Sequence, residues 1–532
     1  MRALRPSTRG RAGLVCTVDH LASSAGVEVL VRGGTAADAA VAASAALAVT
    51  TPHMCGMGGD LFALVHAAPG PPDVLDAAGR AGSGADPDRL RAEGLRVMPF
   101  TGDVRAAPVP GCVDGWCALH ERHGRLPLAE VLGPALRLAT GGFPASPLLV
   151  ATLPRLEGVE GCEELTSIRP RPGDRVVRPG VARMLAAVAE GGRDAFYRGE
   201  FGAALLAVGA GEYTDDDLAE SGASWRPPVG RRVWGHDVWT PPPVSQGYLS
   251  VLGAAVAEAV AGADLPDPEG DGGDGAWAHL LVEAARLAGH DRPAVLHDGA
   301  DGDALVSDDR VAAAAAGFSP DRRAEVRGLG AGGGTIHLCA VDAEGTGVSL
   351  IQSNASGYGS LVAVPGTGVL LHNRGVGFSL EPGHPAEYGP GRQPPHTLAP
   401  ALVTRPDGSL HTVLGTMGGD SQPQIVLQLL ARVLAAGESI GRAVRAPRWV
   451  LASGTGQGFD TWTAGEPIVR VEADAPAAWV EGLRRRGHEV TVASELDVAG
   501  FGHAHGITID EDGTRIGEAD PRAIVGAAIA TA

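Results

Sequence analysis

The pattern of apolar and polar positions predicts a chain of alternating helices and strands. Residues 22–32 and 38–49 have helical periodicity, and the second stretch is almost wholly Ala, Val and Leu, which predicts a helix buried on most sides. Residues 61–65 follow a glycine-rich turn and have the composition of a strand. Residues 248–261 predict a further helix, and residues 279–292 predict an amphipathic one. The pattern alone indicates a mixed α and β protein.

The stretch that begins at Gly332 carries the clearest candidate chemistry. Three glycines run into Thr335, and residues 335–341 alternate in the way of a half-buried strand. A threonine whose own α-amine is freed by chain cleavage carries nucleophile and base on one residue, because the amine, with an unperturbed pKa of about 7.7–8.0, can take the hydroxyl proton. Taken alone, Gly-Gly-Gly-Thr is more simply a flexible linker that enters a strand.

Further glycine, asparagine and hydroxyl motifs follow this stretch and precede it in a fixed order. They are Gly56-Met57-Gly58-Gly59-Asp60, Ser353-Asn354, His372-Asn373-Arg374-Gly375 and Gly415-Thr416-Met417-Gly418-Gly419-Asp420. This series resembles the γ-glutamyltransferase family of N-terminal-nucleophile (Ntn) hydrolases, and the resemblance covers essentially the whole chain. It implies an α+β fold, the four-layer αββα Ntn-hydrolase sandwich. It also implies one domain built from a large-subunit segment, residues 1–334, and a small-subunit segment, residues 335–532, with self-cleavage between Gly334 and Thr335.

The resemblance assigns roles to candidate catalytic residues. Thr335 would be the nucleophile, and Ser353 would hydrogen-bond its amine. The backbone N–H groups of Gly418 and Gly419 would stabilise the oxyanion, because a glycine leaves room for close approach. Arg80 falls where the family has an arginine that binds a substrate carboxylate with its planar fork. On residue type alone, a surface ion pair is the simpler interpretation of Arg80.

The resemblance also implies a set of further substrate-binding residues. They are Asn354, Asn373, Arg374, His396 and Thr397. The chain departs from the family's glutamate-binding members at the acidic residue that holds the substrate's α-amine, because Gly377 takes that place. Asp420 and Glu381 are the alternative acids for this role. A pocket with Arg80 and Arg374 and no such acid would favour an anion without a neighbouring ammonium.

The function expected from the resemblance is that of a γ-glutamyltransferase or glutathione hydrolase. Such an enzyme hydrolyses or transfers a γ-glutamyl or related carboxylate-bearing acyl group through an acyl-threonine intermediate. One alternative is an oxamate-type or natural-product amidohydrolase or transacylase. Another is an unprocessed pseudoenzyme that serves as a binding module. The expected partners are a small-molecule amide and the second chain of the same precursor, with a dimer of these heterodimers as a further option, and no cofactor is expected.

Composition and charge limit the classes of partner. The 532 residues include 43 basic and 62 acidic ones, and the net charge of −19 disfavours nucleic acid and anionic membranes. Six cysteines without a C-x-x-C pair predict reduced thiols. The basic N-terminus is not followed by an apolar stretch of signal-peptide length, so a cytoplasmic protein is expected.

Three remaining features have simpler interpretations. His503 and His505 would share one strand face, but no metal site is expected because no Cys or Glu lies nearby in ligand spacing. Residues 317–334 are polar and Gly-rich, which predicts a mobile tail released by cleavage. Residues 483–488 read as a helix end with a solvated charged face.

Overall fold

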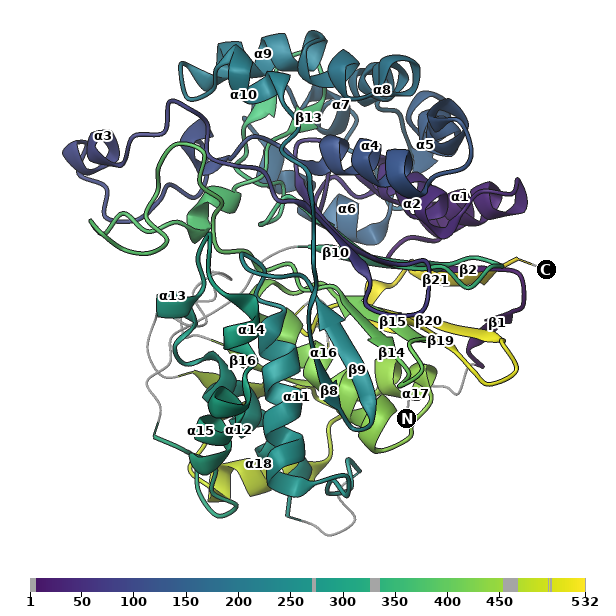
Figure 1. The fold of residues 1–532 in the computed structure, drawn as a ribbon. Helices are drawn as coiled ribbons and strands as arrows, with labels where there is room; N and C mark the ends of the chain where they lie inside the picture. Colours follow the sequence, from purple (N-terminus) through teal and green to yellow (C-terminus); the bar gives the residue numbers. More distant parts are fainter. Residues whose placement is uncertain are drawn as a thin grey trace.

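The computed structural model describes residues 6–269, 274–325, 335–452, 467–495, 497 and 500–531. Two seven-stranded sheets face each other, and helices cover the outer face of each (Figure 1). This arrangement confirms the predicted α+β fold with four layers in the order αββα. Within the described residues, no helix has both the length and the apolar character to cross a membrane.

The first sheet carries the strand that follows Thr335. Its strands, in spatial order, are β21 (Ala527–Ala530), β2 (Leu14–Thr17), β10 (Ile336–Val341), β11 (Gly347–Ser353), β3 (Asp60–His66), β4 (Asp73–Ala77) and β7 (Ser224–Arg226), and neighbours are antiparallel. Helices α1 (His20–Val31), α2 (Ala36–Thr50), α4 (Cys112–His123), α5 (Leu128–Gly141) and α8 (Pro179–Tyr197) belong to the layer over this sheet. Every residue of β3, β10 and β11 is buried, because the strands are covered on both faces.

The second sheet lies opposite and has its own helical layer. Its strands are β1 (Thr8–Gly10), β20 (Arg515–Ala519), β19 (Ala504–Ile509), β15 (Leu410–Thr416), β14 (Ala401–Thr404), β9 (His236–Thr240) and β8 (Val229–Val233). The layer includes α11 (Tyr248–Ala261), α12 (Ala276–Gly289), α15 (Asp308–Ala316), α16 (Gln422–Leu430), α17 (Ile440–Arg445) and α18 (Ala477–Arg485). Both sheets take strands from either side of Thr335, so residues 1–334 and 335–532 form one interleaved body.

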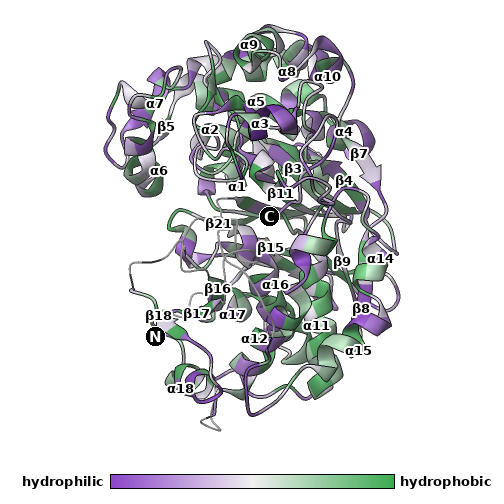
Figure 2. Ribbon diagram, turned by 90° about the vertical axis from the view of Figure 1, so that its left-hand side faces the viewer, coloured by the Kyte–Doolittle hydropathy of each residue, from purple (hydrophilic) through white to green (hydrophobic). Residues whose placement is uncertain are grey.

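Smaller elements decorate the periphery of the two layers. They are α3 (Pro87–Ala92), α6 (Pro147–Thr152), α7 (Glu163–Thr166), α9 (Glu200–Gly209), α10 (Asp215–Ala219), α13 (Arg292–Val295), α14 (Gly302–Leu305), β5 (Phe143–Pro144), β6 (Arg175–Val176), β12 (Ala363–Val364), β13 (Val369–Leu370), β16 (Trp449–Ala452), β17 (Ile468–Val471) and β18 (Val490–Val492). Figure 2 shows hydrophilic residues concentrated in peripheral pieces such as α7 and α10, whereas apolar residues dominate α11 against the second sheet. The hydrophobic core therefore follows the predicted helix and strand pattern.

The predicted helices agree with the structure except in the character of one. Residues 22–32, 38–49 and 248–261 correspond to α1, α2 and α11, and residues 61–65 to β3. The helix predicted over 279–292 exists as α12, but the amphipathic prediction is wrong, since every residue from Trp277 to Gly289 is buried. Trp277 stacks on Trp479 of α18 with ring centroids 5.0 Å apart, and α12 also contacts α11, α15 and α16, so the helix packs on several sides.

Two segments predicted to be solvated are held by hydrogen bonds. Before Thr335, the N–H of Arg323 donates to the carbonyl of Arg486 at 2.8 Å, and Ala324 is buried. The mobile-tail prediction is therefore wrong for this part of residues 317–334, while residues 326–334 lie outside the described residues. In the stretch 483–488, Arg484 and Arg485 are exposed at the end of α18, which agrees with the predicted solvated charged face, whereas Leu483 and His488 are buried.

Candidate active site

Thr335 and Ser353 lie opposite each other at one end of the first sheet. Strand β10 pairs with β11 so that Ile336 is opposite Gln352, which brings Thr335, one position earlier, next to Ser353. Their hydroxyl oxygens are 3.2 Å apart, and both residues are fully buried. The predicted hydroxyl partner thus contacts the predicted nucleophile through the hydroxyl group.

Asp60 extends this pair into a row across three strands. In the pairing of β11 with β3, Ser353 is opposite Asp60, and directly opposed residues project to the same face of a sheet. That face is turned towards the second sheet, because His337, two residues after Thr335, stacks on His505 of β19 with centroids 6.0 Å apart. Thr335, Ser353 and Asp60 therefore line the interior of the sandwich at the end where the site is expected.

The carboxylate of Asp60 gathers residues that are distant in sequence. Its Oδ2 accepts hydrogen bonds from Arg374 Nε at 2.8 Å, from His396 Nε2 at 3.0 Å and from His372 Nδ1 at 3.2 Å. Burial alone would raise the pKa of Asp60, but the guanidinium and the two imidazoles more than offset it and hold the pKa well below its usual range. Asp60 is thus an anion at neutral pH.

His396 is held in one tautomer beside this anion. Burial lowers the pKa of His396 to about 4, and the nearby guanidinium of Arg374 acts in the same direction, so the ring is neutral at pH 7. Its Nδ1 accepts the N–H of Leu398 at 3.2 Å, which leaves Nε2 as the protonated nitrogen that donates to Asp60. A predicted substrate-binding residue is therefore fully used inside the protein.

A hydrogen-bonded path connects Asp60 to the predicted oxyanion loop. Arg374 Nη1 donates to Thr397 Oγ1 at 2.7 Å. Gln246 Nε2 lies 2.9 Å from the carbonyl oxygen of Thr397 and 3.0 Å from that of Gly419, and donates to both. The structure therefore brings Thr335, Ser353, Arg374, His396, Thr397 and Gly419 into one connected assembly.

The loop at Gly418 and Gly419 has a backbone that favours glycine. Gly418 has φ 134° and Gly419 has φ 57°, both in the left-handed half of the Ramachandran plot. The carbonyl of Gly418 accepts from the N–H and the hydroxyl of Ser421. Among the described residues, the N–H groups of Gly418 and Gly419 donate to no acceptor, which is the state an oxyanion hole requires before substrate binds.

Arg80 lies in a surface ion pair. Its Nη1 donates to the carbonyl of Gly391 at 3.0 Å and to Asp298 Oδ2 at 3.4 Å, and 44% of its side chain is exposed. Within the described part of the chain, Arg80 makes no hydrogen bond to the row of Thr335 and Asp60. Binding of a substrate carboxylate by Arg80 stays a prediction, and it would require competition with Asp298.

Asn373 holds two loops together. Its Oδ1 accepts from the N–H of Ser356 at 3.0 Å, and its Nδ2 donates to the carbonyl of Phe100 at 2.9 Å. Both ends of the amide are therefore engaged within the protein. Contact of Asn373 with a substrate would need one of these bonds to open.

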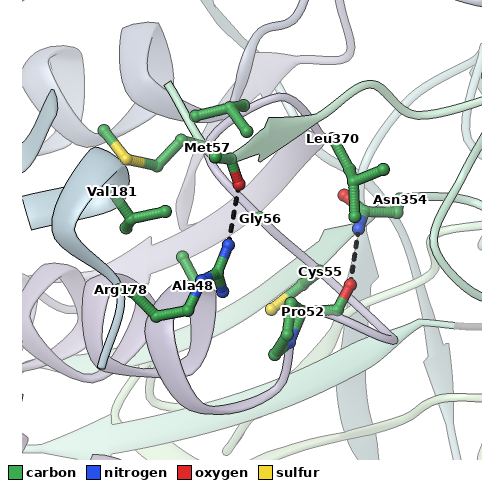
Figure 3. A pocket seen from close by; sticks show the side chains of 11 residues that line it. Ala48, Pro52, Cys55, Gly56, Met57, Arg178, Val181, Asn354 and Leu370 are labelled. Atoms are coloured by element: carbon green, nitrogen blue, oxygen red, sulfur yellow. Dashed lines mark hydrogen bonds between the residues drawn. The ribbon is translucent and has the colours of Figure 1, made fainter. Parts of the chain in front are cut away.

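Asn354 is turned to the other face of the first sheet. Its Nδ2 donates to the carbonyl of Pro52 at 3.2 Å, and its Oδ1 has no hydrogen-bond partner among the described residues (Figure 3). The amide lines a cavity of about 10 Å³ whose other walls include Ala48 of α2 and Val181 of α8. A space of that size holds at most one water molecule. The structure therefore separates Asn354 from Thr335.

The sequence motifs assign no role to Asp60, His372 or Gln246, although Asp60 and His372 lie within motifs that carry the family resemblance. The glycine turn before Asp60 was the one sequence feature that pointed to this residue. The structure explains why glycine is needed there, because a Cβ at Gly59 would lie 2.3 Å from the carbonyl oxygen of Ser353. The backbone at position 59 can approach β11, the strand of Ser353, only as glycine. The partners of Asp60 are more than 300 positions away, so no local pattern reveals them.

His503 and His505 are buried between the sheets beside the site. Burial lowers the pKa of His503 to about 4 and that of His505 to about 3, so both rings are neutral. In the parts of the chain that the structure describes, no group of three or more His, Cys, Asp and Glu side chains is arranged to hold a metal ion. Both ring nitrogens of His503 lack a hydrogen-bond partner there.

The cluster around Asp60 predicts how stability depends on pH. Because the pKa of His396 is about 4 in the folded protein and 6.5 in its unperturbed form, the unfolded chain binds more protons between these values, and stability falls as pH drops through this window. The depressed pKa of Asp60 adds stability that is lost only below about pH 3.9. His396→Gln should therefore lower the urea midpoint at pH 7 but show a shallower decline from pH 7 to 4.5.

Ser250→Ala is the control, because it removes a buried hydrogen bond to the carbonyl of Gly247 but no titratable group. Ser250→Ala should leave the wild-type slope of midpoint against pH unchanged. An equal slope for His396→Gln and wild type would show that His396 does not titrate with folding.

Comparison with known proteins agrees with this geometry. The family model described as gamma-glutamyltranspeptidase matches residues 22–530. The glutathione hydrolase-like YwrD proenzyme of Bacillus subtilis is 34% identical over 533 residues, which cover 98% of both chains. The oxamate amidohydrolase proenzyme of Klebsiella pneumoniae is 34% identical over 530 residues, covering 96% of this chain and 97% of the relative.

A solved structure supports the same relationship. The crystal structure of cephalosporin acylase from Bacillus halodurans superimposes with a TM-score of 0.88 at 31% identity, covering 100% of this chain and 98% of that chain. Sequence family, fold and the arrangement around Thr335 thus point the same way. The chain belongs to the gamma-glutamyltranspeptidase family and is an amide-hydrolysing enzyme of the Ntn class.

Proposed function

We propose that the protein hydrolyses, or transfers the acyl group of, a small carboxylate-bearing amide, with Thr335 as nucleophile after a cut between Gly334 and Thr335. Gly334 lies outside the described residues, so the support comes from Thr335 itself. The observation that carries the proposal is the 3.2 Å contact between the hydroxyls of Thr335 and Ser353 in the row that ends at Asp60. Relatives named as proenzymes support a precursor that is cleaved.

The chemistry follows from the groups in place. The α-amine of Thr335 takes the proton of its own hydroxyl, and Oγ1 attacks the substrate carbonyl carbon. The carbonyl oxygen becomes an oxyanion, which the N–H groups of Gly418 and Gly419 receive. The C–N bond then breaks, the leaving amine takes the proton from the α-ammonium, and an ester remains on Thr335. Water activated by the same amine hydrolyses the ester, and an acceptor amine in place of water gives transfer.

The two products of the cut would stay together as a heterodimer. Both sheets pair strands from residues 1–334 with strands from residues 335–532, so separation would break ladders in the core. A dimer of these heterodimers is a further proposal. We also propose a cytoplasmic location, which the six unpaired thiols support.

The glycine at position 377 supports a donor without an α-ammonium. A Cβ at Gly377 would lie 2.4 Å from the carbonyl oxygen of Pro395, so this backbone leaves no room for an acidic side chain at that place. Glu381 is exposed, whereas Asp420 is buried next to Gly419 and lies 3.6 Å from Arg292. Asp420 is therefore the acid that could bind the α-ammonium of an amine-bearing substrate.

A second candidate function is cleavage of a compact amide such as oxamate, or of a larger acyl amide. The similarities to oxamate amidohydrolase and to cephalosporin acylase favour these activities, because neither name denotes a glutamyl substrate. Glutathione hydrolase is the name of the Escherichia coli relative at 27% identity, and the Bacillus subtilis relative at 34% identity is named glutathione hydrolase-like. The intact hydroxyl pair of Thr335 and Ser353 argues against a pseudoenzyme.

Donor preference tests the substrate class. We compare kcat/KM for a γ-glutamyl amide, for the glutaryl amide that lacks only the α-amine, and for oxamate, with Thr335→Ala as the inactive control. An α-ammonium left without an acid costs about 1–3 kcal/mol, roughly fivefold to more than a hundredfold in kcat/KM. The glutaryl amide should therefore be at least as good a donor as the γ-glutamyl amide. A strong preference for the amine-bearing donor would show that Asp420 or another acid binds the ammonium.

The role of Arg80 is tested in the same assay. Arg80→Ala should lower kcat/KM about tenfold or more for both carboxylate-bearing donors, because a charge-assisted bidentate pair is lost. Arg122→Ala, which breaks a comparably exposed ion pair with Asp73, should leave both values unchanged. If Arg80→Ala behaves like Arg122→Ala, Arg80 is a surface residue with no substrate role.

The oxyanion loop is tested with a single methyl group. A Cβ at Gly418 would lie 2.4 Å from Ser421 Oγ, and φ 134° is unfavourable for alanine, so Gly418→Ala should displace the two N–H donors. Loss of one such donor costs about 10²–10³ in kcat. Gly33→Ala is the control, since Gly33 also has positive φ but faces open space. Equal kcat for the two variants would remove the loop from the mechanism.

A further inference from the structure

A buried polar cluster that the proposed chemistry does not use holds the chain that leads to Thr335. It comprises His279, Glu283 and Arg286 of α12 and His488, which follows α18, and we name these four residues the tail clamp. All four are 5% exposed or less. Since α12 precedes Thr335 in sequence and His488 follows it, the tail clamp joins the two segments that cleavage would separate.

Two residues of the tail clamp bind the backbone of Ala324. Glu283 Oε2 accepts the N–H of Ala324 at 2.5 Å, and Arg286 Nη1 donates to the carbonyl of Ala324 at 3.2 Å. The same Nη1 donates to Glu283 Oε1 at 2.5 Å, so one ion pair binds both backbone polar groups of a single residue. The contact fixes the position of the chain at residue 324 without using its side chain.

His279 holds the chain a few residues earlier. Its Nε2 lies 2.8 Å from the carbonyl oxygen of Ser319 and must therefore carry the proton. Its Nδ1 is then an acceptor, and His488 Nε2, 3.0 Å away, is the donor to it. Burial lowers the pKa of His279 to about 4 and that of His488 to about 3, which keeps both rings neutral in this arrangement.

The end of α18 adds two contacts from the other segment. Arg486 Nε donates to the carbonyl of Pro320 at 2.6 Å, and the carbonyl of Arg486 accepts the N–H of Arg323. Residues 319–324 are thus bound along their length by groups from both sides of Thr335. These are hydrogen bonds to backbone atoms, which fix the position of a peptide segment, and not the apolar side-chain contacts that form a core.

We propose that the tail clamp positions the precursor for self-cleavage and afterwards keeps the new chain end bound to both products. The proposal rests on the cut between Gly334 and Thr335. Ten residues, 325–334, separate the clamped residue from that bond, so the tether spans at most about 35 Å. When the upstream end of this tether is fixed, the scissile peptide has less conformational entropy to lose as it reaches Thr335 Oγ1.

The experiment follows conversion of freshly translated full-length chain into two fragments over time. Glu283→Ala removes the acceptor and the partner of Arg286, and Glu283→Gln keeps an acceptor oxygen but not the charge. The control is Glu438→Ala, which breaks the buried 2.9 Å ion pair with Arg432 and does not touch residues 319–324. Each variant is assayed at the same interval below its own Tm, so that a general loss of stability is matched.

We expect Glu283→Ala to process about tenfold or more slowly than Glu438→Ala, and Glu283→Gln to lie between them. The kcat of the fraction that has been processed should equal that of wild type. Ala324→Pro deletes the N–H that Glu283 accepts and leaves the ion pair with Arg286 intact, so it should slow processing as well. This variant replaces Glu283→Ala in the test if Glu283→Ala does not fold.

Two results would overturn the proposal, and they are distinguishable. Processing of Glu283→Ala and Ala324→Pro at the rate of Glu438→Ala would refute the tail clamp alone. A wild-type chain that stays full length, like Thr335→Ala, would refute self-cleavage and the tail clamp with it.

Discussion

The active end of this molecule depends on one buried carboxylate. Asp60 begins a central strand, lies opposite Ser353 in the ladder and accepts three hydrogen bonds from side chains beyond position 370. An anion without water is tolerated only when it is paired, and here the Arg374 guanidinium supplies the charge. Removal of one member of such a buried pair typically costs about 3–5 kcal/mol, because the other charge stays buried alone. The site and the local stability therefore share one interaction.

This carboxylate also explains how a two-part chain can build one site. Thr335 and Ser353 come from residues 335–532, whereas Asp60 and Gln246 come from residues 1–334. Hydrogen bonds cross between the segments at the nucleophile row, at the oxyanion loop and at the tail clamp, so a cut before Thr335 would release an amine without releasing either piece. In the core, both sheets contain strands from the two segments, and these ladders would also hold the two pieces together.

Local patterns predicted the parts of the structure that local physics decides. The apolar run of residues 38–49 forms a fully buried helix, as its pattern predicts. The pairing of Ser353 with Thr335 is expected from the family resemblance and not from a local pattern. The pattern failed where polar groups are paired inside the protein. His279, Glu283 and Arg286 recur at helical spacing and indicate a solvated face, yet all three are buried because they bind one another and the chain before Thr335.

The candidate substrate-binding residues show a similar limit. Arg374, His396 and Thr397 do gather near the nucleophile, but their partner Asp60 could not be predicted because the contacts join distant parts of the sequence. Asn354 follows Ser353 directly, and strand alternation sends its side chain to the opposite face. Arg80 is near an acid, Asp298, that no spacing reveals.

In the proposed mechanism, Thr335 is both the new N-terminus and the acylated residue. Mass spectrometry of the enzyme, quenched in acid during turnover of a glutaryl amide and then digested, tests this most directly. We predict a chain that begins at Thr335 and carries the added glutaryl mass on its first residue. An adduct on any other residue, or turnover by a chain that is intact across residues 334 and 335, would rule out this mechanism.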